Sequence, residues 1–194
     1  MKINIIAAMS KNRIIGNNGL LPWNIKKDLK YFNELTSKNN SACLMGHNTW
    51  KSIPGYPDPQ TLPNRGKIII SKNNINLIRG NVISKYPLDY NDFQAPLYQN
   101  CYPNIWICGG QSIYEFYINK SYINNIYLTE IDKNIEGDTY FPKIPDNFVL
   151  YKRSKTYYNK FNALEFFPYS FCIYKNIDYQ PISLSNEQQT VNIY

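Results

Sequence analysis

Short apolar runs rich in β-branched residues recur between residues 3 and 130, and this recurrence constrains the fold of the chain more than any other feature. The runs are Ile3–Met9, Ala42–Met45, Lys67–Ser71, Asn81–Ser84, Ile105–Cys108 and Ile126–Glu130. Longer polar or helix-like segments separate them, which is typical of strands that pair in parallel. The pattern predicts an α/β fold with a central, mostly parallel sheet and helices on both of its faces.

The last third of the chain has a different pattern. Phe148–Tyr158 and Glu165–Tyr174 are long strand-like segments, joined by a short polar connection around Asn159 to Asn162. So short a connection can join only antiparallel neighbours. We therefore expect a C-terminal antiparallel hairpin that closes one edge of the sheet.

A chain of 194 residues fits a single domain, which we place at residues 1–177. Residues 178–194 are polar and show little periodicity, so we expect a tail or the start of a linker there. Lys11–Asn24 and Pro54–Arg65 look irregular, and the second is rich in turn-forming residues.

The formal net charge of +7 indicates a surface that attracts anions, whether nucleic acid, a membrane surface or phosphorylated small molecules. The lysines are scattered, without a basic helix or an arginine-rich run, so we expect no nucleic-acid partner. No run approaches the roughly 18 apolar residues of a membrane helix, and the N-terminus lacks the apolar region of a signal peptide. We therefore expect a cytoplasmic protein without a membrane partner.

The four cysteines are widely spaced and form no CxxC pair. This spacing predicts neither a zinc site nor a disulfide framework. Cys43 and Cys108 lie in apolar runs, and we expect them to pack as small core residues.

A predicted helix from Asn24, as N-cap, to about Thr36 carries a carboxylate among its apolar residues. The apolar positions at helical spacing are Ile25, Leu29, Phe32 and Leu35. Asp28 lies on the same stripe, where an ionised carboxylate is costly unless it is paired or hydrogen-bonded. Either Asp28 has a functional role, or it lies at the edge of the stripe and stabilises the helix N-terminus.

Five stretches match one family in order and spacing. They are IIAAMSKNRIIGNNGLLPWNIKKDLKYF at 5–32, MGHNTWKSIP at 45–54, LPNRGKIIIS at 62–71, WICGGQSIYEF at 106–116 and YLTEIDKNIEGDTYFP at 127–142. Together they resemble the dihydrofolate reductases, and the resemblance spans residues 2 to about 177. One motif alone would be weak, whereas five in the right order are not expected by chance.

The resemblance implies NADPH-dependent reduction of 7,8-dihydrofolate to 5,6,7,8-tetrahydrofolate, with hydride passing from the nicotinamide to the pterin. In this interpretation Asp28 holds the pterin by accepting hydrogen bonds from its 2-amino group and ring nitrogen, and Thr129 joins that network. Leu21 and Tyr114 complete the catalytic positions, Tyr114 near the nicotinamide. The Lys11–Asn24 loop corresponds to a lid over the nicotinamide.

The resemblance also assigns the substrate and cofactor contacts. Arg65 corresponds to the arginine that binds the glutamate carboxylate of the substrate, a role suited to its planar fork. The other substrate positions are Ile6, Ala8, Phe32, Ile53 and Cys108, with the backbone groups of Ile6 and Cys108 available for polar contacts. For the apolar side chains the alternative is ordinary core packing. The cofactor positions are Ala8, Ile15, Gly16, Gly46, His47, Asn48, Thr49, Ser71, Lys72, Lys85, Gly109, Gly110, Gln111, Ser112, Ile113 and Tyr114.

Two features of these cofactor positions bear on how the cofactor binds. Gly109-Gly110 opens a helix at Gln111 but is not the GxGxxG motif of a Rossmann module, and family members have a cis peptide between these glycines. His47, the only histidine, stands where the family usually has Lys or Arg, although a lone histidine is more often structural. Ser71, Lys72 and Lys85 match positions near the adenosine 2′-phosphate, and the two lysines favour NADPH.

Two other functions remain open. One is a related reductase, similar to those of the riboflavin pathway, that acts on a different pyrimidine or pterin. The other is a catalytically idle nucleotide- or RNA-binding protein with the same fold. LPW followed by Asp28 and Phe32 favours folate. Some family members are fused to thymidylate synthase, and the tail is compatible with such a linker; otherwise we expect a monomer that binds dihydrofolate and antifolates.

Overall fold

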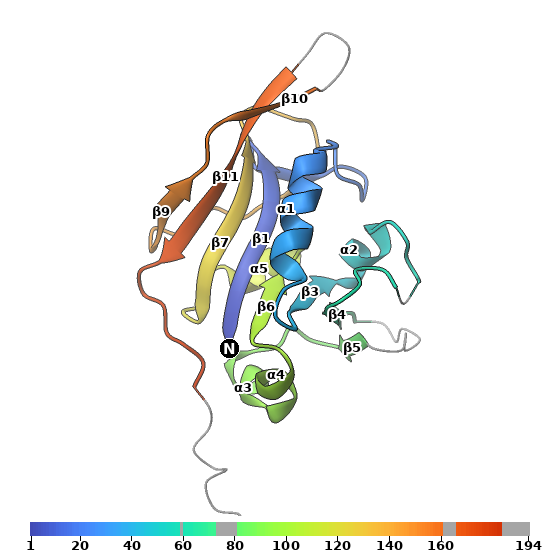
Figure 1. The fold of residues 1–194 in the computed structure, drawn as a ribbon, viewed down its shortest axis with the longest axis vertical. Helices are drawn as coiled ribbons and strands as arrows, with labels where there is room; N and C mark the ends of the chain where they lie inside the picture. The colour runs from blue at the N-terminus through green and yellow to red at the C-terminus, as the bar shows by residue number, and fades with distance from the viewer. Residues whose placement is uncertain (59, 73–80, 161–165, 184–194) are drawn as a thin grey trace, which may run out of the picture.

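A mostly parallel sheet with the strand order β10-β11-β7-β1-β6-β3-β4-β5 organises the computed structural model, and β9 also pairs with β11 (Figure 1). The structure describes residues 1–58, 60–72, 81–160 and 166–183. The strands of this sheet are β1 Lys2–Ser10, β3 Ala42–Gly46, β4 Gly66–Ile70, β5 Asn81–Ser84, β6 Asn104–Ile107, β7 Ile123–Ile131, β9 Phe148–Arg153, β10 Tyr157–Lys160 and β11 Phe166–Asn176. Each predicted run from Ile3 to Glu130 is a strand in the structure, with ends shifted by a few residues at most.

The pairing confirms the predicted architecture. All pairs among β1, β3, β4, β5, β6 and β7 are parallel, whereas β11 runs antiparallel to β7, β9 and β10. The helices are α1 Lys26–Thr36, α2 His47–Ser52, α3 Tyr90–Gln94, α4 Pro96–Cys101 and α5 Gln111–Tyr117. Parallel strands need crossover connections, and these helices lie in them.

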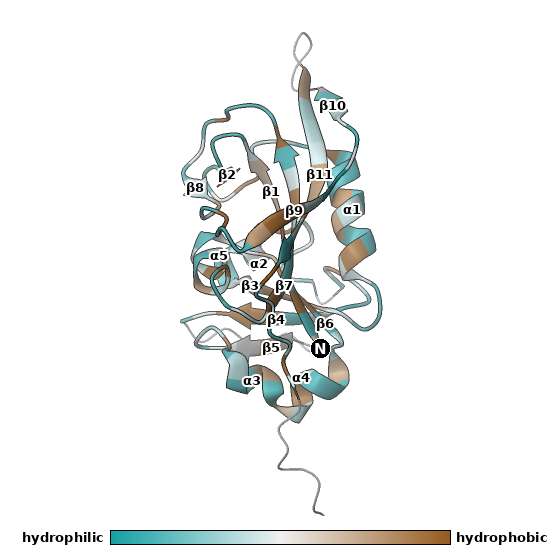
Figure 2. Ribbon diagram, turned by 90° about the vertical axis from the view of Figure 1, so that its left-hand side faces the viewer, coloured by the Kyte–Doolittle hydropathy of each residue, from teal (hydrophilic) through white to brown (hydrophobic). Residues whose placement is uncertain are grey.

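The helices cover both faces of the sheet, as predicted. On one face Trp50 of α2 packs against Cys43, Met45 and Ile69 of the neighbouring strands. On the other face Tyr117 of α5 joins the main core, to which α3 and α4 also contribute. In Figure 2, α1 carries both hydrophilic and hydrophobic stretches, as expected of a helix that has one side toward the sheet.

The predicted strand Phe148–Tyr158 is wrong as one element, because it divides into β9 and β10. Between them Ser154 exchanges two hydrogen bonds with Phe171 of β11, one from its backbone N–H at 2.8 Å and one to its hydroxyl at 3.0 Å. β9 then pairs with Cys172–Asn176 and β10 with Phe166–Tyr169. Asn159, expected in the polar connection, lies within β10, whereas residues 161 and 162 lie outside the described residues.

The start of α1 also differs from the prediction. The helix begins at Lys26, and its N-cap is Ile25, which provides no side-chain cap, rather than Asn24. Ile25 is buried in a cluster with Ile14 and Trp23, so apolar packing rather than capping holds this end. Leu29 exposes 52% of its surface and does not belong to a buried stripe.

The Lys11–Asn24 segment, predicted to be irregular, contains the short strand β2 Ile14–Gly16. It pairs with β8 Thr139–Tyr140 in a separate two-stranded sheet. Hydrogen bonds between segments distant in sequence produce this strand, which a local pattern does not reveal. Residues 54–58 and 60–65 form turns and bends, as expected, with a cis Tyr56-Pro57 bond.

The chain continues past Ile177 along the body of the protein. Ile182 is buried against the main core, and the Gln180 N–H donates to the Ser121 carbonyl at 3.0 Å. The described part of the chain therefore packs at least as far as Ile182. Among its helices, none has the length and apolarity that a membrane crossing requires.

Candidate active site

Asp28, in the first turn of α1, and Thr129, in β7, meet between the helix and the sheet. The Thr129 hydroxyl donates to Oδ1 of Asp28 at 2.5 Å, and Thr129 is almost completely buried. Burial raises the pKa of the Asp28 carboxyl, and the bond from Thr129 partly opposes this shift. The contact predicted between these two residues is present.

The strand register brings further predicted residues to this face of the sheet. Ala8 of β1 lies opposite Thr129, and Ile6 lies on the same face two residues earlier. The Ile6 carbonyl accepts a hydrogen bond from the Tyr114 hydroxyl at 2.8 Å, so Tyr114 reaches β1 from α5. Tyr114 is buried, which raises its pKa well above the ordinary value.

The fold uses a backbone group of both Ile6 and Cys108. The Ile6 carbonyl accepts the hydrogen bond from Tyr114. The Cys108 N–H is already engaged, because it donates to the Leu44 carbonyl at 2.8 Å and extends the pairing of β3 and β6. Apart from the Cys108 N–H, the availability of these backbone groups to a ligand stays a prediction.

Four apolar side chains at or near the predicted site are only partly covered. Phe32 and Ile53 are half-buried and pack against the cluster of Cys43, Met45, Trp50 and Ile69. Leu21 and Leu29 each expose 52% of their surface. Sequence reasoning placed Leu29 on the buried stripe of the helix, and only the structure shows that it is exposed.

Arg65 is buried beside the C-terminal half of α1. Its guanidinium donates to the Thr36 hydroxyl and to the Asn33 side-chain oxygen, and its Nε donates to the Pro63 carbonyl at 3.0 Å. These bonds use three of the five guanidinium N–H groups. No carboxylate among the described residues forms an ion pair with Arg65.

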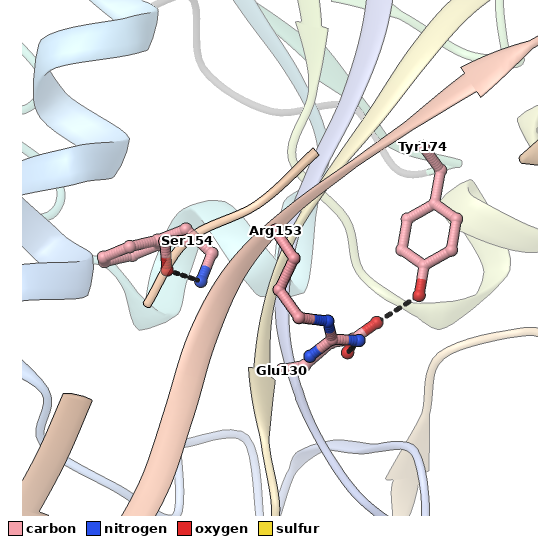
Figure 3. A network of polar contacts seen from close by, with 5 residues as sticks. Glu130, Arg153, Ser154 and Tyr174 are labelled. Carbon is pink, nitrogen blue, oxygen red and sulfur yellow. Dashed lines mark hydrogen bonds and ion pairs between the residues drawn. The ribbon is translucent and has the colours of Figure 1, made fainter. Parts of the chain in front are cut away.

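Figure 3 shows how Glu130, the residue after Thr129 on β7, is held. Because side chains alternate along a strand, Glu130 lies on the face opposite to Thr129. Glu130 lies between Arg153 of β9 and Tyr174 of β11, with its Oε2 at 2.6 Å from Nη2 of Arg153. The Tyr174 hydroxyl donates to the other carboxylate oxygen, Oε1. This network connects β7 to the C-terminal strands and so supports the strand that carries Thr129.

Glycines bring β3 and the start of α5 close together. The Gly46 N–H donates to the Gly109 carbonyl at 2.7 Å, and the Gly109-Gly110 bond is cis, as expected. Gly109 has a φ of 106°, and a Cβ there would lie 3.0 Å from the Tyr114 ring. A Cβ on Gly110 would lie 3.1 Å from the Thr49 hydroxyl oxygen. Larger residues therefore do not fit at these positions without displacing their neighbours.

His47, Ser71 and Lys85 each directly follow one of the parallel strands β3, β4 and β5. Because these strands are neighbours and parallel, the three residues share the carboxyl edge of the sheet, the usual place for a ligand in such sheets. Nε2 of His47 is buried without a hydrogen-bond partner among the described residues. Burial, with a smaller effect of Lys51, lowers the pKa of His47.

The remaining predicted cofactor positions include both exposed and buried residues. Gln111 links α5 to β8, because its side-chain oxygen accepts a hydrogen bond from the Tyr140 N–H at 2.8 Å. The positions that are exposed or half-buried are Ile15, Asn48, Thr49, Lys72, Gln111 and Ser112, and the buried ones are Gly16 and Ile113.

Comparison with known proteins is consistent with this arrangement. The sequence profile described as dihydrofolate reductase matches residues 2–176. The chain belongs to the dihydrofolate reductase family. A dihydrofolate reductase of Buchnera aphidicola subsp. Baizongia pistaciae is 39% identical over 146 residues, which cover 73% of this chain and 78% of the relative. A dihydrofolate reductase of Heliothis virescens is 37% identical over 74% of this chain and 80% of the relative. One of Buchnera aphidicola subsp. Schizaphis graminum is 36% identical over 89% of this chain and 96% of the relative.

Family membership makes this chain an oxidoreductase. The dihydrofolate reductase family reduces dihydrofolate to tetrahydrofolate with a nicotinamide cofactor, and it binds antifolates as well as the substrate. The match along nearly the whole chain favours this function over the two alternatives that the sequence left open.

Proposed function

We propose that the protein reduces 7,8-dihydrofolate to 5,6,7,8-tetrahydrofolate with NADPH as hydride donor, and that Asp28 anchors the pterin. The observation that supports this assignment most strongly is the contact of the Thr129 hydroxyl with the Asp28 carboxylate at 2.5 Å. This half-buried carboxylate has no basic partner in the described chain, so donors from a ligand can pair with it.

The geometry of Asp28 suits a pterin. Thr129 occupies Oδ1, so the remaining lone pairs of the carboxylate are left for the 2-amino group and the adjacent ring nitrogen. Charge-assisted bonds to two parallel donors are stronger than neutral ones. Burial destabilises the ionised carboxylate in the free protein, so a pterin that carries a proton at this site restores a favourable partner.

The walls of the site position the ring and exclude water. Phe32 and Ile53 are half-buried on the side of α1 and α2, and Leu21 and Leu29 offer exposed apolar surface that a bound substrate can cover. Burying this surface favours binding by roughly 25 cal/mol per Å². Excluding water strengthens the interaction with Asp28. Contact with the walls holds the two reacting rings in place.

The residues at the carboxyl edge of the sheet fit a phosphorylated cofactor. When bound, NADPH supplies the hydride, and the protein has only to orient it. The glycine pair Gly109-Gly110 leaves the backbone open to close approach, and the unpartnered Nε2 of His47 is a polar atom for a ligand to satisfy. Tyr114 supports this side of the site through its bond to Ile6.

Discrimination of NADPH from NADH rests on positive charge near the adenosine. Lys72 and Lys85 are exposed and follow β4 and β5 closely, so they are free to approach a 2′-phosphate. His47 adds charge only at acidic pH, since its pKa is lowered. We assign the preference for NADPH chiefly to the two lysines.

Arg65 is the proposed partner of the substrate glutamate tail. Two of its N–H groups are not used by Thr36, Asn33 and Pro63, and a carboxylate can take both in a bidentate pair. We also propose that residues 1–177 form the catalytic domain, and that residues 178–194 form its tail or the start of a linker, of which the first part packs on the domain as far as Ile182. We further propose that the protein acts as a cytoplasmic monomer.

The test is the decrease in NADPH absorbance in the presence of dihydrofolate. We expect turnover with NADPH, much weaker turnover with NADH at equal concentration, and loss of turnover in an Asp28→Asn variant. Asp146→Asn, which alters an exposed aspartate far along the chain, is the control. Absence of turnover in a folded wild-type protein that binds NADPH would contradict the proposal.

A further inference from the structure

Strand β10 holds the start of α1 through two contacts. The Lys27 ammonium lies 3.4 Å from the centre of the Tyr157 ring, and the Asn159 side chain donates a hydrogen bond to the Asn24 carbonyl at 3.2 Å. Tyr157 and Asn159 are two residues apart in an extended strand, so both side chains point to the same face of β10. This face is directed toward the first turn of α1 (Figure 1).

The start of α1 has little stabilisation from its own polar groups. Its N-cap residue, Ile25, forms no side-chain cap. Lys26 and Lys27 put two positive charges in the first turn beside the single carboxylate of Asp28, although the helix dipole disfavours positive charge there. The electron-rich face of the Tyr157 ring attracts the Lys27 ammonium and so compensates for this unfavourable position.

The Tyr157 ring belongs to an aromatic cluster that continues to the candidate site. Its ring centre lies 5.6 Å from that of Tyr169 and 5.7 Å from that of Phe171. The centre of the Phe171 ring in turn lies 4.4 Å from that of Tyr31 on α1. In the pairing of β11 with β7, Phe171 lies opposite Thr129. The cluster therefore packs α1 against the strands at the position of the Thr129 hydroxyl.

We propose that Lys27 and Tyr157 are positioning residues, whose contact holds the first turn of α1 against β10 and so keeps the Asp28 carboxylate at the Thr129 hydroxyl. Lys27 and Tyr31 are four residues apart and share the side of α1 that meets the aromatic cluster, and Asp28 follows Lys27 directly. The effect on substrate rests on the proposed function, in which Asp28 binds the pterin. Lys27 and Tyr157 act through Asp28 and not on the substrate itself.

The test compares the steady-state kinetics of Tyr157→Leu, Tyr157→Phe and Lys27→Gln with those of the wild type. A cation–π contact at an exposed site corresponds to a factor of about two to five in an equilibrium constant. We therefore expect kcat/KM for dihydrofolate to fall about three- to fivefold in Tyr157→Leu and in Lys27→Gln. Tyr157→Phe keeps the ring and should stay within about twofold of the wild type. The KM for NADPH should not change in any of these variants.

Two matched controls alter neighbouring residues of the same types. Tyr158→Leu replaces the next tyrosine of β10, which is 72% exposed, and Lys26→Gln removes the other positive charge of the same helical turn. Both should behave like the wild type. The double variant of Lys27→Gln and Tyr157→Leu should be no worse than Tyr157→Leu alone, because the contact can be lost only once.

Amide hydrogen exchange in the ligand-free protein follows the start of α1 without any substrate. The Asp28 and Leu29 N–H groups donate to the Ile25 carbonyl at 2.9 and 3.2 Å, so their exchange reports opening of the first turn. We expect this exchange to be about three- to fivefold faster in Tyr157→Leu and Lys27→Gln. In the two control variants it should be unchanged.

Unchanged exchange in the folded variants of Lys27 and Tyr157 overturns the proposal, and so does an equal loss of kcat/KM in Tyr157→Phe and Tyr157→Leu. Faster exchange with unchanged kcat/KM overturns the positioning role in a protein whose Asp28→Asn variant loses turnover. If Asp28→Asn keeps wild-type turnover, the proposed function of Asp28 is contradicted, and exchange alone then decides whether the contact holds α1. Lys27 is exposed, so Lys27→Gln provides the test even if Tyr157→Leu does not fold.

Discussion

The Thr129 hydroxyl on β7 donates to the Asp28 carboxylate on α1 at 2.5 Å, so one hydrogen bond joins the helix to the sheet at the candidate site. The two residues are separated by 101 positions in the chain. Thr129 is nearly inaccessible, while the carboxylate keeps a free oxygen for a ligand. This contact provides the first two predictions.

Replacing Asp28 with Asn should lower the rate of dihydrofolate reduction at least tenfold near neutral pH. Asn keeps the shape of the side chain but loses the charge that stabilises a protonated pterin, a loss of more than about 1.4 kcal/mol. Steady-state kinetics with saturating NADPH measures the effect, and Asp146→Asn is the control. Near-wild-type turnover in the Asn variant with unchanged cofactor binding would refute the role of Asp28.

The same variant should be more stable than the wild type at pH 7 when no ligand is present. Burial raises the pKa of Asp28 in the folded protein above its ordinary 3.8, so the folded state holds this proton more tightly than the unfolded state. The wild type therefore loses stability as pH rises from about 3.8 through the raised value. Urea unfolding at several pH values should show that the stability advantage of the Asn variant grows over this pH interval and disappears near pH 3. A stability difference that does not change with pH would contradict a raised pKa for Asp28.

Arg65→Leu should have two separable effects. Loss of the guanidinium leaves Thr36 and Asn33 without their donor, and we expect the free energy of unfolding to fall by about 1–3 kcal/mol. Dihydrofolate should bind more weakly by roughly 1.5–3 kcal/mol, whereas a pterin without the glutamate tail should bind nearly as well as to the wild type. Equal losses for both ligands would mean that Arg65 only supports the loop beside α1.

His47→Arg should strengthen NADPH binding most at neutral and alkaline pH. Burial lowers the pKa of His47, so its positive charge is present only below about pH 6.5, whereas arginine stays charged. The ratio of NADPH affinities, variant over wild type, should rise between about pH 5 and 7 and then level off. The titration of the phosphate is common to both proteins and cancels in the ratio. Identical pH profiles would show that His47 does not reach the phosphate, and NADH serves as the control ligand.

Ile182→Ala tests whether the chain beyond Ile177 belongs to the folded body. Ile182 is buried in the main core, so truncation should lower the free energy of unfolding by about 2 kcal/mol or more. Ile177→Ala alters a residue that is 63% exposed and should change stability by less than about 0.5 kcal/mol. Urea denaturation compares the two variants. Equal, small effects would place the end of the packed chain at residue 177.

The sequence alone determined most of the strands, their parallel pairing and the residues to examine at the site. Apolar runs with β-branched residues identify strands because side-chain alternation and burial are local properties, and the predicted Asn81–Ser84 matches β5 at both ends. Longer connections between the runs imply parallel pairing, which the sheet shows. The family motifs indicated which residues to examine, including Asp28 and Thr129.

Only the tertiary structure decided how these residues are connected. It showed that Arg65 is bound to Thr36 and Asn33, and that Ser154 divides a predicted strand. It also placed the start of α1 at Lys26, because the burial of Ile25 replaces capping by Asn24. Each of these features depends on a partner from another part of the chain. A local pattern records what a residue prefers, whereas hydrogen bonds and packing depend on which distant segments the sheet brings within a few ångströms.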